Sequence, residues 1–435
     1  MDWTDASVAD IKRKERIFMK VVGIIAEYNP FHNGHAYQID TIKRDAQADY
    51  VIAAMSGNFV QRGAPALLDK YARAEMALRC GVDLVLELPV LFACASAEAF
   101  ARGGVSLLCD TGVVTHLGFG METSHFGLLS QIADVLLRQP SVFQDSLRTE
   151  LKQGLSFPAA RAKALETYFL CDGPACDVQP LLQETLAAPN NILAVEYLKA
   201  LKSLGSGIIP SPLQRKGSGY HDPSLDRRLS SATGIRAFVT SCKDRAFQPL
   251  ENAMPAASLG ILTGYPYPFL AEDDFSILAH YKLLTESLEC LSSYADSSRP
   301  LASRMKKHAH QFTNWHGFCE QLKTKNITYT HLSRLLLHMT LGIKAQDCKD
   351  FPKPLYLRAL GFSKKAAPLL SAIKAKGTLP LLTSPAKSSS LLPSVAQRML
   401  AFDLDASSLY ALGQNGKGCC HIPNDYQIPI VIHTG

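Results

Sequence analysis

The sequence has no apolar run approaching the roughly 18–20 residues that a membrane-spanning helix needs. Its first 20 residues are charged throughout and lack the apolar segment of a secretory signal. The 11 cysteines are odd in number and scattered, with no C-x-x-C pair, so we expect neither a disulfide framework nor a zinc site. We therefore predict a cytoplasmic protein with no membrane segment and no fixed metal ligands.

Charged residues make up only 19% of the 435 positions, and residues 256–435 contain no dense run of lysine and arginine. With 47% hydrophobic residues, this is an ordinary globular composition and excludes a mainly disordered chain. Residues 256–435 hold 19 basic and 12 acidic side chains, whereas the first 255 hold 26 and 27. A basic excess confined to one part of the chain favours a polyanionic partner such as RNA, although a solvated lysine-rich helical surface would give the same count.

Short apolar, β-branched runs alternate with helical segments through the first 120 residues. Strands are predicted at 21–26, 50–55, 83–88 and 116–119, with helices at about 36–46, 68–80 and 93–109. This alternation at ~25–30 residue spacing is typical of βαβ units. We predict an α/β fold with a Rossmann-like, doubly wound parallel sheet, which would bind ligands at the carboxyl ends of its strands.

The character of the sequence changes near residue 256. Before it, helical segments at 127–169, with breaks at Pro140 and Pro158, and at 190–204 lead to a Gly-rich loop at 213–222. After it, Leu-rich helical segments follow without strand alternation. We predict a nucleotide-binding domain at 19–255, a basic, mainly helical domain at 256–435, and an N-terminal extension at 1–18.

The most informative motif is Asn29-Pro30-Phe31-His32-Asn33-Gly34-His35, which directly follows the first predicted strand. It places two imidazoles around a glycine at a helix start, where free N–H groups and the helix dipole favour phosphate. The glycine permits close approach of a phosphate to the backbone, and the histidines can stabilise charge that builds on a leaving pyrophosphate. We predict that His32 and His35 are catalytic.

A second motif, Ser230-Ser231-Ala232-Thr233-Gly234-Ile235-Arg236, combines hydroxyl residues with an arginine at another predicted helix start. This pattern also suits a phosphate. Taken alone, it is equally consistent with an ordinary helix cap beside a surface arginine.

The two motifs together resemble those of the HxGH nucleotidyltransferase superfamily. The segments GIIAEYNPFHNGHAYQI, MSGNFVQRGAPALLDKYARAEMAL, GVDLVLELP, PNNILAVEYL and RKGSGYHD are similar to those of the tRNA(Met) cytidine acetate ligase family. This resemblance covers about residues 20–245 and continues more weakly to the end. It implies an enzyme that uses ATP with Mg2+ and acetate, forms acetyl-adenylate, and acetylates N4 of the wobble cytidine of elongator tRNA(Met).

The resemblance also implies a set of ATP-binding positions, of which either asparagine of a consecutive pair could serve. They are Ile25, Ala26, Glu27, Tyr28, Asn29, Pro30, Phe31, His32, Asn33, Gly34, His35, Gln38, Gly120, Asn190 or Asn191, Arg215, Ser231 and Arg236. Two alternatives remain open: a small-molecule adenylyltransferase of the same superfamily, and a tRNA-binding module that binds ATP without chemistry. The oligomeric state is left open as well.

Further candidates lie beside these motifs. Gly57, Asn58, Arg62, Lys70 and Arg73, which follow the second predicted strand, are candidates for binding acetate or phosphate, or else belong to an ordinary charged helix surface. Asp83 opens the third strand and is interpreted as structural, whereas a buried Glu87 would need a partner. Scattered basic residues of the second half are tRNA-binding candidates: Arg304, Lys306, Lys307, Lys364 and Lys365.

Overall fold

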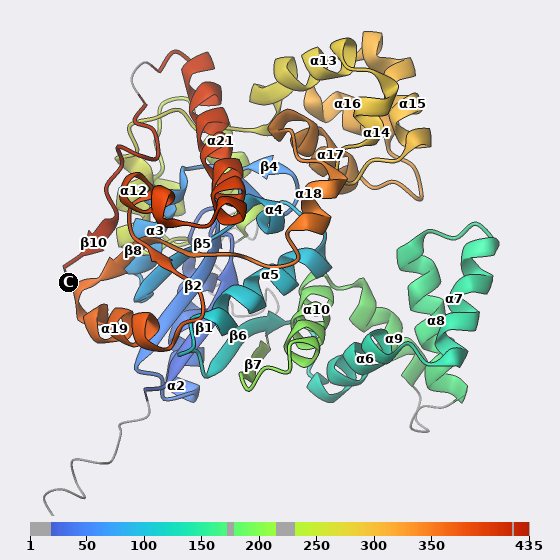
Figure 1. Ribbon diagram of the computed structural model, residues 1–435, viewed down its shortest axis with the longest axis horizontal. Coiled ribbons are helices and arrows are strands. Elements are labelled where there is room, and N and C mark those ends of the chain that lie inside the picture. The colour runs from blue at the N-terminus through green and yellow to red at the C-terminus, as the bar shows by residue number, and fades with distance from the viewer. Residues whose placement is uncertain (1–18, 172–177, 215–230, 420–421, 435) are drawn as a thin grey trace, which may run out of the picture.

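The protein is built around an eight-stranded sheet with helices on both faces (Figure 1). The structure is a computed structural model that describes residues 19–171, 178–214, 231–419 and 422–434. The predicted extension at 1–18 lies outside these residues. The strands are Val21–Ala26 (β1), Tyr50–Ser56 (β2), Phe59–Val60 (β3), Ala64–Pro65 (β4), Leu84–Leu88 (β5), His116–Met121 (β6), Ile209–Gln214 (β7), Leu357–Ser363 (β8), Leu381–Leu382 (β9) and Val431–His433 (β10).

The order of the main sheet is β10-β8-β5-β2-β1-β6-β7, with β9 beside β8, and β3 and β4 form a separate hairpin. All neighbours in the main sheet are parallel except β5 and β8, which are antiparallel. The chain moves from β1 to β2 on one side and later to β6 on the other. The reversal places the expected ligand crevice at the carboxyl end of β1. The predicted doubly wound fold is confirmed.

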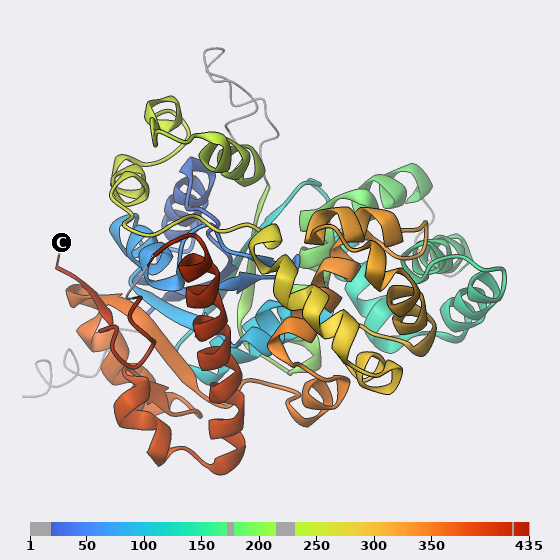
Figure 2. The ribbon, with the colours of Figure 1, turned by 90° about the horizontal axis from the view of Figure 1, so that it is seen from above.

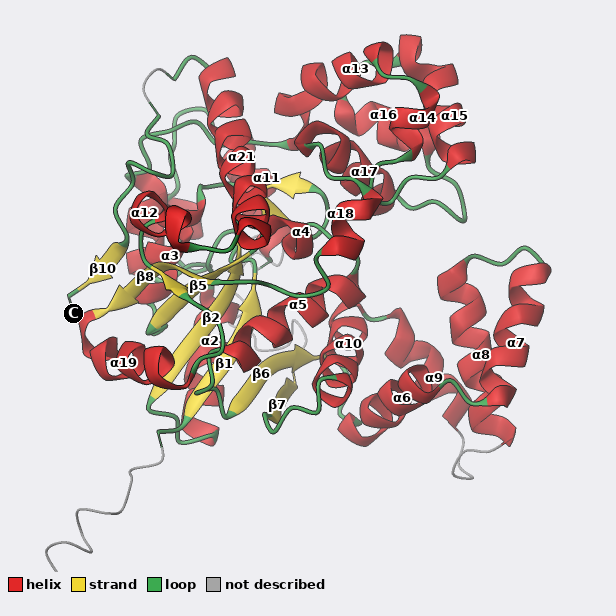
Figure 3. Ribbon diagram, viewed as in Figure 1, coloured by secondary structure: helices red, strands yellow, loops and turns green. Residues whose placement is uncertain are grey.

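The central strands are buried on both faces, as the continuous apolar runs predict. In β2, Ile52 and Ala54 pack into one hydrophobic core, and Val51, Ala53 and Met55 pack into the other. The second core lies under α2, α3, α11 and α12, whereas the first lies under α5, α6, α10, α19 and α21 (Figure 3).

Most helices of the first half follow the predictions, but those at 90–93 and 178–187 were not predicted, and the helix predicted at 93–109 begins at Ala97. They are Asn33–Asp45 (α2), Lys70–Arg79 (α3), Val90–Ala93 (α4), Ala97–Asp110 (α5), Phe126–Arg138 (α6), Ser141–Lys152 (α7), Phe157–Cys171 (α8), Val178–Ala187 (α9), Pro189–Ser203 (α10) and Ala232–Ser241 (α11). The break predicted at Pro158 occurs earlier, before Phe157, because proline is tolerated in the first turn of a helix.

Most of the second half is helical. Its helices are Ala256–Thr263 (α12), Ser276–Thr285 (α13), Leu288–Ser292 (α14), Arg299–His308 (α15), Trp315–Leu322 (α16), Tyr329–Leu341 (α17), Ala345–Asp350 (α18), Ala367–Lys376 (α19), Pro385–Ser388 (α20) and Ser394–Gly416 (α21), with a 3-10 turn, Glu272–Phe275 (η2), before α13. We call residues 276–350, which carry α13 to α18, the helical lobe; Figure 2 shows it beside the sheet.

The expectation that no strand follows residue 256 is wrong. β8 and β10 extend the main sheet beyond β5, so residues from the end of the chain complete a sheet that begins at Val21. The segment LRALGFS of β8 has few β-branched residues, and β10 has only three residues, so neither gives a strand pattern. The domain division at residue 256 stays a prediction.

The helical lobe packs directly on the hairpin that follows β2. The Ser333 hydroxyl donates to the Gly63 carbonyl over 2.9 Å. Gly63 has φ +76°, and a Cβ there would lie 2.3 Å from the backbone nitrogen of Arg334, so only glycine fits this contact. The hairpin therefore links the carboxyl edge of the sheet to the helical lobe.

Candidate active site

The two motif histidines form a reciprocal cap at the start of α2. His32 is the N-cap residue, and its Nδ1 accepts the Gly34 N–H over 3.0 Å. The Nδ1 of His35 accepts the His32 N–H over 3.3 Å, and the two rings stack with centroids 3.8 Å apart. Because both Nδ1 atoms accept hydrogen bonds, each neutral imidazole carries its proton on Nε2. The motif thus presents two ring N–H donors at a helix N-terminus, which suits an anion.

Gly34 is required by this geometry. A Cβ at this position would lie 2.9 Å from Cε1 of the His32 ring. Any larger residue would push the ring away from the N–H group that fixes its tautomer. The glycine between the histidines therefore sets the histidine pair itself, besides leaving the backbone accessible.

The second predicted motif meets the first in space. Ser231 caps α11 by accepting the Gly234 N–H over 3.1 Å. Arg236 donates through Nη1 to the Asn29 carbonyl over 2.8 Å and through Nη2 to the Thr233 hydroxyl over 3.1 Å. Residues about 200 positions apart in the chain thus form one site at the carboxyl end of β1.

The remaining predicted ATP positions divide into two groups. Ile25, Ala26, Gln38 and Gly120 lie on β1, α2 and β6 around the crevice. The rings of Tyr28 and Phe31 are buried in the core, 4.9 Å apart, and the Asn33 side chain donates to Asn252, so these residues support the loop. The Asn29–Pro30 peptide is cis. Arg215 lies outside the described residues.

The two asparagines at the start of α10 have different surroundings. Asn191 is buried, and its Oδ1 accepts the Glu122 N–H over 2.8 Å and the Thr123 N–H over 3.3 Å. Its side chain therefore ties α10 to the end of β6. Asn190 is half-buried and donates to the Glu122 carboxylate. Of the two, Asn190 is the more exposed.

The basic residues predicted to bind acetate or phosphate are mostly engaged elsewhere. The buried Arg73 donates only to backbone carbonyls, which are those of Leu68, Glu27, Ser56 and Gly57. Burial lowers its pKa. Arg73 therefore holds the loops after β1 and β2 together. Arg62, in contrast, is exposed on the hairpin and has no ion pair among the described residues.

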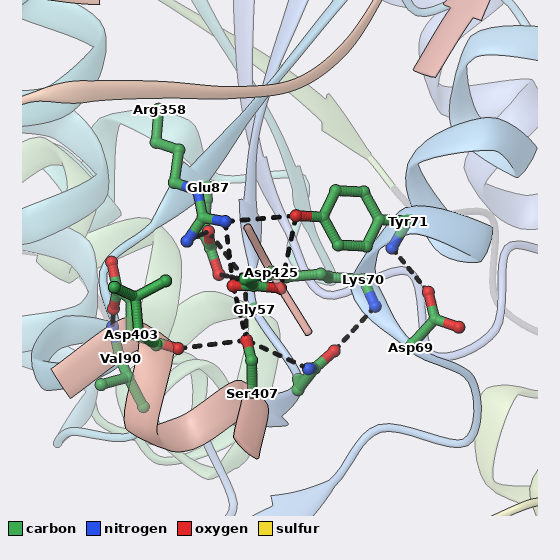
Figure 4. A network of polar contacts seen from close by, with 12 residues as sticks. Gly57, Asp69, Lys70, Tyr71, Glu87, Val90, Arg358, Asp403, Ser407 and Asp425 are labelled. Carbon is green, nitrogen blue, oxygen red and sulfur yellow. Dashed lines mark hydrogen bonds and ion pairs between the residues drawn. The ribbon is translucent and has the colours of Figure 1, made fainter. Parts of the chain in front are cut away.

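Lys70 is equally buried and belongs to an ion network (Figure 4). Its ammonium contacts Glu87 at 2.8 Å and Asp425 at 2.6 Å, and Arg358 contacts the same two carboxylates at 2.9 Å each. Burial and Arg358 would lower the pKa of Lys70, but the two carboxylates hold it above its ordinary value. Neither Lys70 nor Arg73 is a surface charge, and the cations of both are engaged by protein groups.

The ion network also holds in place the loop after β2, which carries Gly57 and Asn58. Asn58 Oδ1 accepts the Lys70 N–H over 2.8 Å, and a Cβ on Gly57 would lie 2.6 Å from Glu87 Oε1. Burial and Glu87 raise the pKa of Asp403, which accepts the Val90 N–H and the Tyr356 hydroxyl, to about 7. The prediction that Glu87 needs a partner holds. Its partners are Lys70 and Arg358, which also share Asp425, and the sequence did not predict them.

The tRNA candidates are spread over two places. Arg304, Lys306 and Lys307 lie on α15 of the helical lobe, but the Lys306 ammonium caps carbonyls of Leu283, Leu284 and Glu286. Lys364 and Lys365 follow β8, where the antiparallel direction places them at the opposite edge of the sheet from the histidines. Lys365 pairs there with Asp83, which also accepts the Val51 N–H as a structural residue.

Comparison with known proteins places this geometry in a family. The family model HIGH Nucleotidyl Transferase matches residues 19–421. A curated tRNA(Met) cytidine acetate ligase of Halothermothrix orenii is 37% identical over 95% of this chain and 99% of its own length. That of Clostridium kluyveri is 39% identical over 91% and 95%. The chain belongs to the tRNA(Met) cytidine acetate ligase family. The resemblance drawn from the motifs is confirmed.

Solved structures of this ligase family share the fold over nearly the whole chain. Thermotoga maritima TmcAL bound with alpha-thio ATP superposes with a TM-score of 0.87 at 32% identity, covering 96% of this chain and all of that one. The apo form has a TM-score of 0.88 at 33% identity. No helix in the described part of this family member is long and apolar enough to cross a membrane.

Proposed function

We propose that this protein is an ATP-dependent ligase that activates acetate as acetyl-adenylate and acetylates N4 of the wobble cytidine of elongator tRNA(Met). The observation that carries the proposal is the meeting of the two phosphate motifs through the Arg236–Asn29 hydrogen bond. It occurs in a chain 37% identical to curated tRNA(Met) cytidine acetate ligases over most of its length. We further propose that the protein acts in the cytoplasm.

The residues at the crevice suit adenylate chemistry. An acetate oxygen attacks the α-phosphorus of ATP, and pyrophosphate leaves. The Nε2–H groups of His32 and His35, the first turn of α2 and Arg236 stabilise the charge that moves onto the leaving group. No group of three or more potential metal ligands occurs in the described residues, so we propose that Mg2+ arrives on the ATP phosphates and keeps most of its waters.

The acceptor tRNA is proposed to bind along the carboxyl edge of the sheet and the helical lobe. Arg62 on the hairpin and Arg304 and Lys307 on α15 are the cations proposed to contact its phosphates. Lys364 and Lys365 do not fit this footprint, because they lie at the other edge of the sheet.

The test is to incubate unmodified bulk tRNA with the protein, Mg-ATP and isotopically labelled acetate, and to analyse nucleosides by mass spectrometry. Labelled N4-acetylcytidine is the expected product. ATP consumption without a labelled nucleoside would support a small-molecule adenylyltransferase instead. A folded protein that binds tRNA but neither consumes ATP nor acetylates would be a binding module.

A further inference from the structure

Acetyl transfer to cytosine needs a proton acceptor. When the N4 amine attacks the acetyl carbonyl, a nitrogen–carbon bond forms and the amine must lose one proton. The histidine pair is committed to the phosphates in the proposed function, on which this inference rests. A group near the same crevice but pointing away from the histidines is therefore needed.

Glu27 lies at the carboxyl end of β1, one residue beyond the strand, and is half-buried. Arg73 fixes its backbone by donating to its carbonyl over 2.7 Å. Its carboxylate is fixed by one oxygen, because Oε1 accepts the Gln61 N–H over 2.9 Å. The other oxygen, Oε2, makes no hydrogen bond or ion pair with any described residue. The side chain is thus held in place with one acceptor site left over.

Neighbouring carboxylates near this edge are already occupied. Glu87 and Asp425 pair with Lys70 and Arg358, as Figure 4 shows. Asp69 caps α3 with one oxygen and accepts the Tyr265 hydroxyl with the other. Both oxygens of Glu122 accept hydrogen bonds from the start of α10. Each of these groups has a structural role that uses its oxygens.

The charge of Glu27 acts on the arginine of the second phosphate motif. Its charge raises the pKa of Arg236 against a larger lowering by burial, so the carboxylate lies within electrostatic range of the second phosphate motif. After burial, it is also a cause of the raised pKa of Tyr197, on α10 across the crevice. The charge of Glu27 therefore acts on both Arg236 and Tyr197.

The strand register adds a second polar group. Ala26 pairs with Met55, so Glu27 and Ser56 lie side by side at the ends of β1 and β2. The Ser56 hydroxyl is fully buried and has no hydrogen-bond partner among the described residues. The Ser56 hydroxyl is therefore a polar group at this corner of the site to which no described residue is hydrogen-bonded.

We propose that Glu27 is the catalytic residue that binds the cytidine N4 amine and accepts its proton. A carboxylate is the natural acceptor for the N4 amino group of cytosine. N4 attacks the acetyl carbonyl, the bond between the acetyl carbon and the phosphate oxygen breaks, AMP leaves with that electron pair, and the N4 proton passes to Oε2 and then to water. No other reactant is required.

The experiment separates the two half-reactions in full-length protein. Acetate-dependent exchange of labelled pyrophosphate into ATP reports adenylate formation, and single-turnover acetylation of tRNA reports transfer. Glu27 is also one of the predicted ATP-binding positions, but in Glu27→Gln the amide oxygen can still accept the Gln61 N–H, so we expect exchange to fall far less than transfer. Transfer should fall by at least ~100-fold, in the range that a general base contributes.

Glu272 supplies a matched control, because its charge also acts on Arg236 but from η2. Glu272→Gln should leave both half-reactions near the parent rates. Equal losses of exchange and transfer in Glu27→Gln would overturn the proposal, as would unchanged transfer, or a transfer-specific loss in Glu272→Gln instead. A parent protein that neither exchanges nor acetylates would mean that the proposed function has failed, which is a distinct result.

Discussion

Two regions at the carboxyl edge of the sheet are built in different ways. The histidine cap is local: His32, Gly34 and His35 determine it among themselves within one turn. The ion network around Lys70 joins residues from β5, β8 and the C-terminal segment, the last 355 positions away. The comparison shows that chemistry can be encoded in a short motif. The ion network around Lys70, which we call the platform, depends instead on distant parts of the chain.

The two cations of α3 show the same contrast on a smaller scale. Lys70 pairs with carboxylates, whereas Arg73 donates hydrogen bonds to backbone carbonyls of the loops that carry the site. Both charges are fully buried, so both must be compensated inside the protein. Lys70 therefore belongs to the platform, and Arg73 joins the platform to the motif.

The largest expected effect comes from removing one member of the network. Lys70→Met leaves Glu87 and Asp425 to share Arg358, so the free energy of unfolding should fall by about 3–5 kcal/mol, measured by urea denaturation. Lys417→Met, which removes an exposed pair with Asp274, should cost less than about 1 kcal/mol. The double variant Lys70→Met/Asp425→Asn should recover part of the loss. Equal effects of the two single variants would erase the contrast between platform and surface.

Removing a motif histidine should act mainly on the chemistry. In His35→Ala, the rate of acetylation should fall by about 100–1,000-fold, the range for losing one preorganised donor. The free energy of unfolding should fall by no more than about 1–2 kcal/mol, because the His32 N–H loses its cap, and the tRNA affinity should stay close to that of the parent protein. His316→Ala, at an exposed position of the helical lobe, serves as the control. Retained acetylation in His35→Ala would exclude the catalytic role.

The pH dependence of stability should report on Asp403. Its folded pKa of about 7 lies above the unfolded value, so the folded state holds the extra proton at low pH. Stability from this group is therefore complete below about pH 4 and declines as pH rises to about 7. Asp403→Asn should be more stable relative to the parent at pH 8 than at pH 5, by about 1–3 kcal/mol in urea titrations. A pH-independent difference would contradict this assignment.

The smallest effects concern the tRNA surface. Arg304→Glu/Lys307→Glu should weaken tRNA binding about tenfold at 0.1 M salt and reduce the salt slope by about 1–2. Lys364→Glu/Lys365→Glu should change the affinity less than twofold, because these lysines lie at the opposite edge. Filter binding over a salt series measures both. A larger effect of the second pair would move the tRNA footprint to that edge.

Much of the nucleotide half was predictable because its signals are local. The apolar runs of β1, β2 and β5 and the caps at His32 and Ser231 are readable within a few residues. β8 escaped prediction because an antiparallel partner 270 residues away makes it a strand, not its own composition. For a related reason, the burial of Lys70 and Arg73 was not predicted. Lys70 and Arg73 are buried because Arg358, Asp425 and the loop carbonyls lie around them, and the α3 sequence alone does not predict this.

The position of Asp425 has a consequence for synthesis of the protein. A ribosome produces the complete histidine motif early, but Lys70 gains its second carboxylate only when the final residues of the described chain emerge. Until then the Lys70 ammonium is more stable in water than in the interior. The N-terminus of α3 therefore cannot pack under the loop after β2. A chain that reaches Arg236 but stops before Asp425 would thus contain both phosphate motifs and still lack a rigid site. Such a chain would stay open to proteases until Asp425 reaches Lys70, so the presence of Asp425, rather than of the sequence motifs alone, marks the point at which the site becomes rigid.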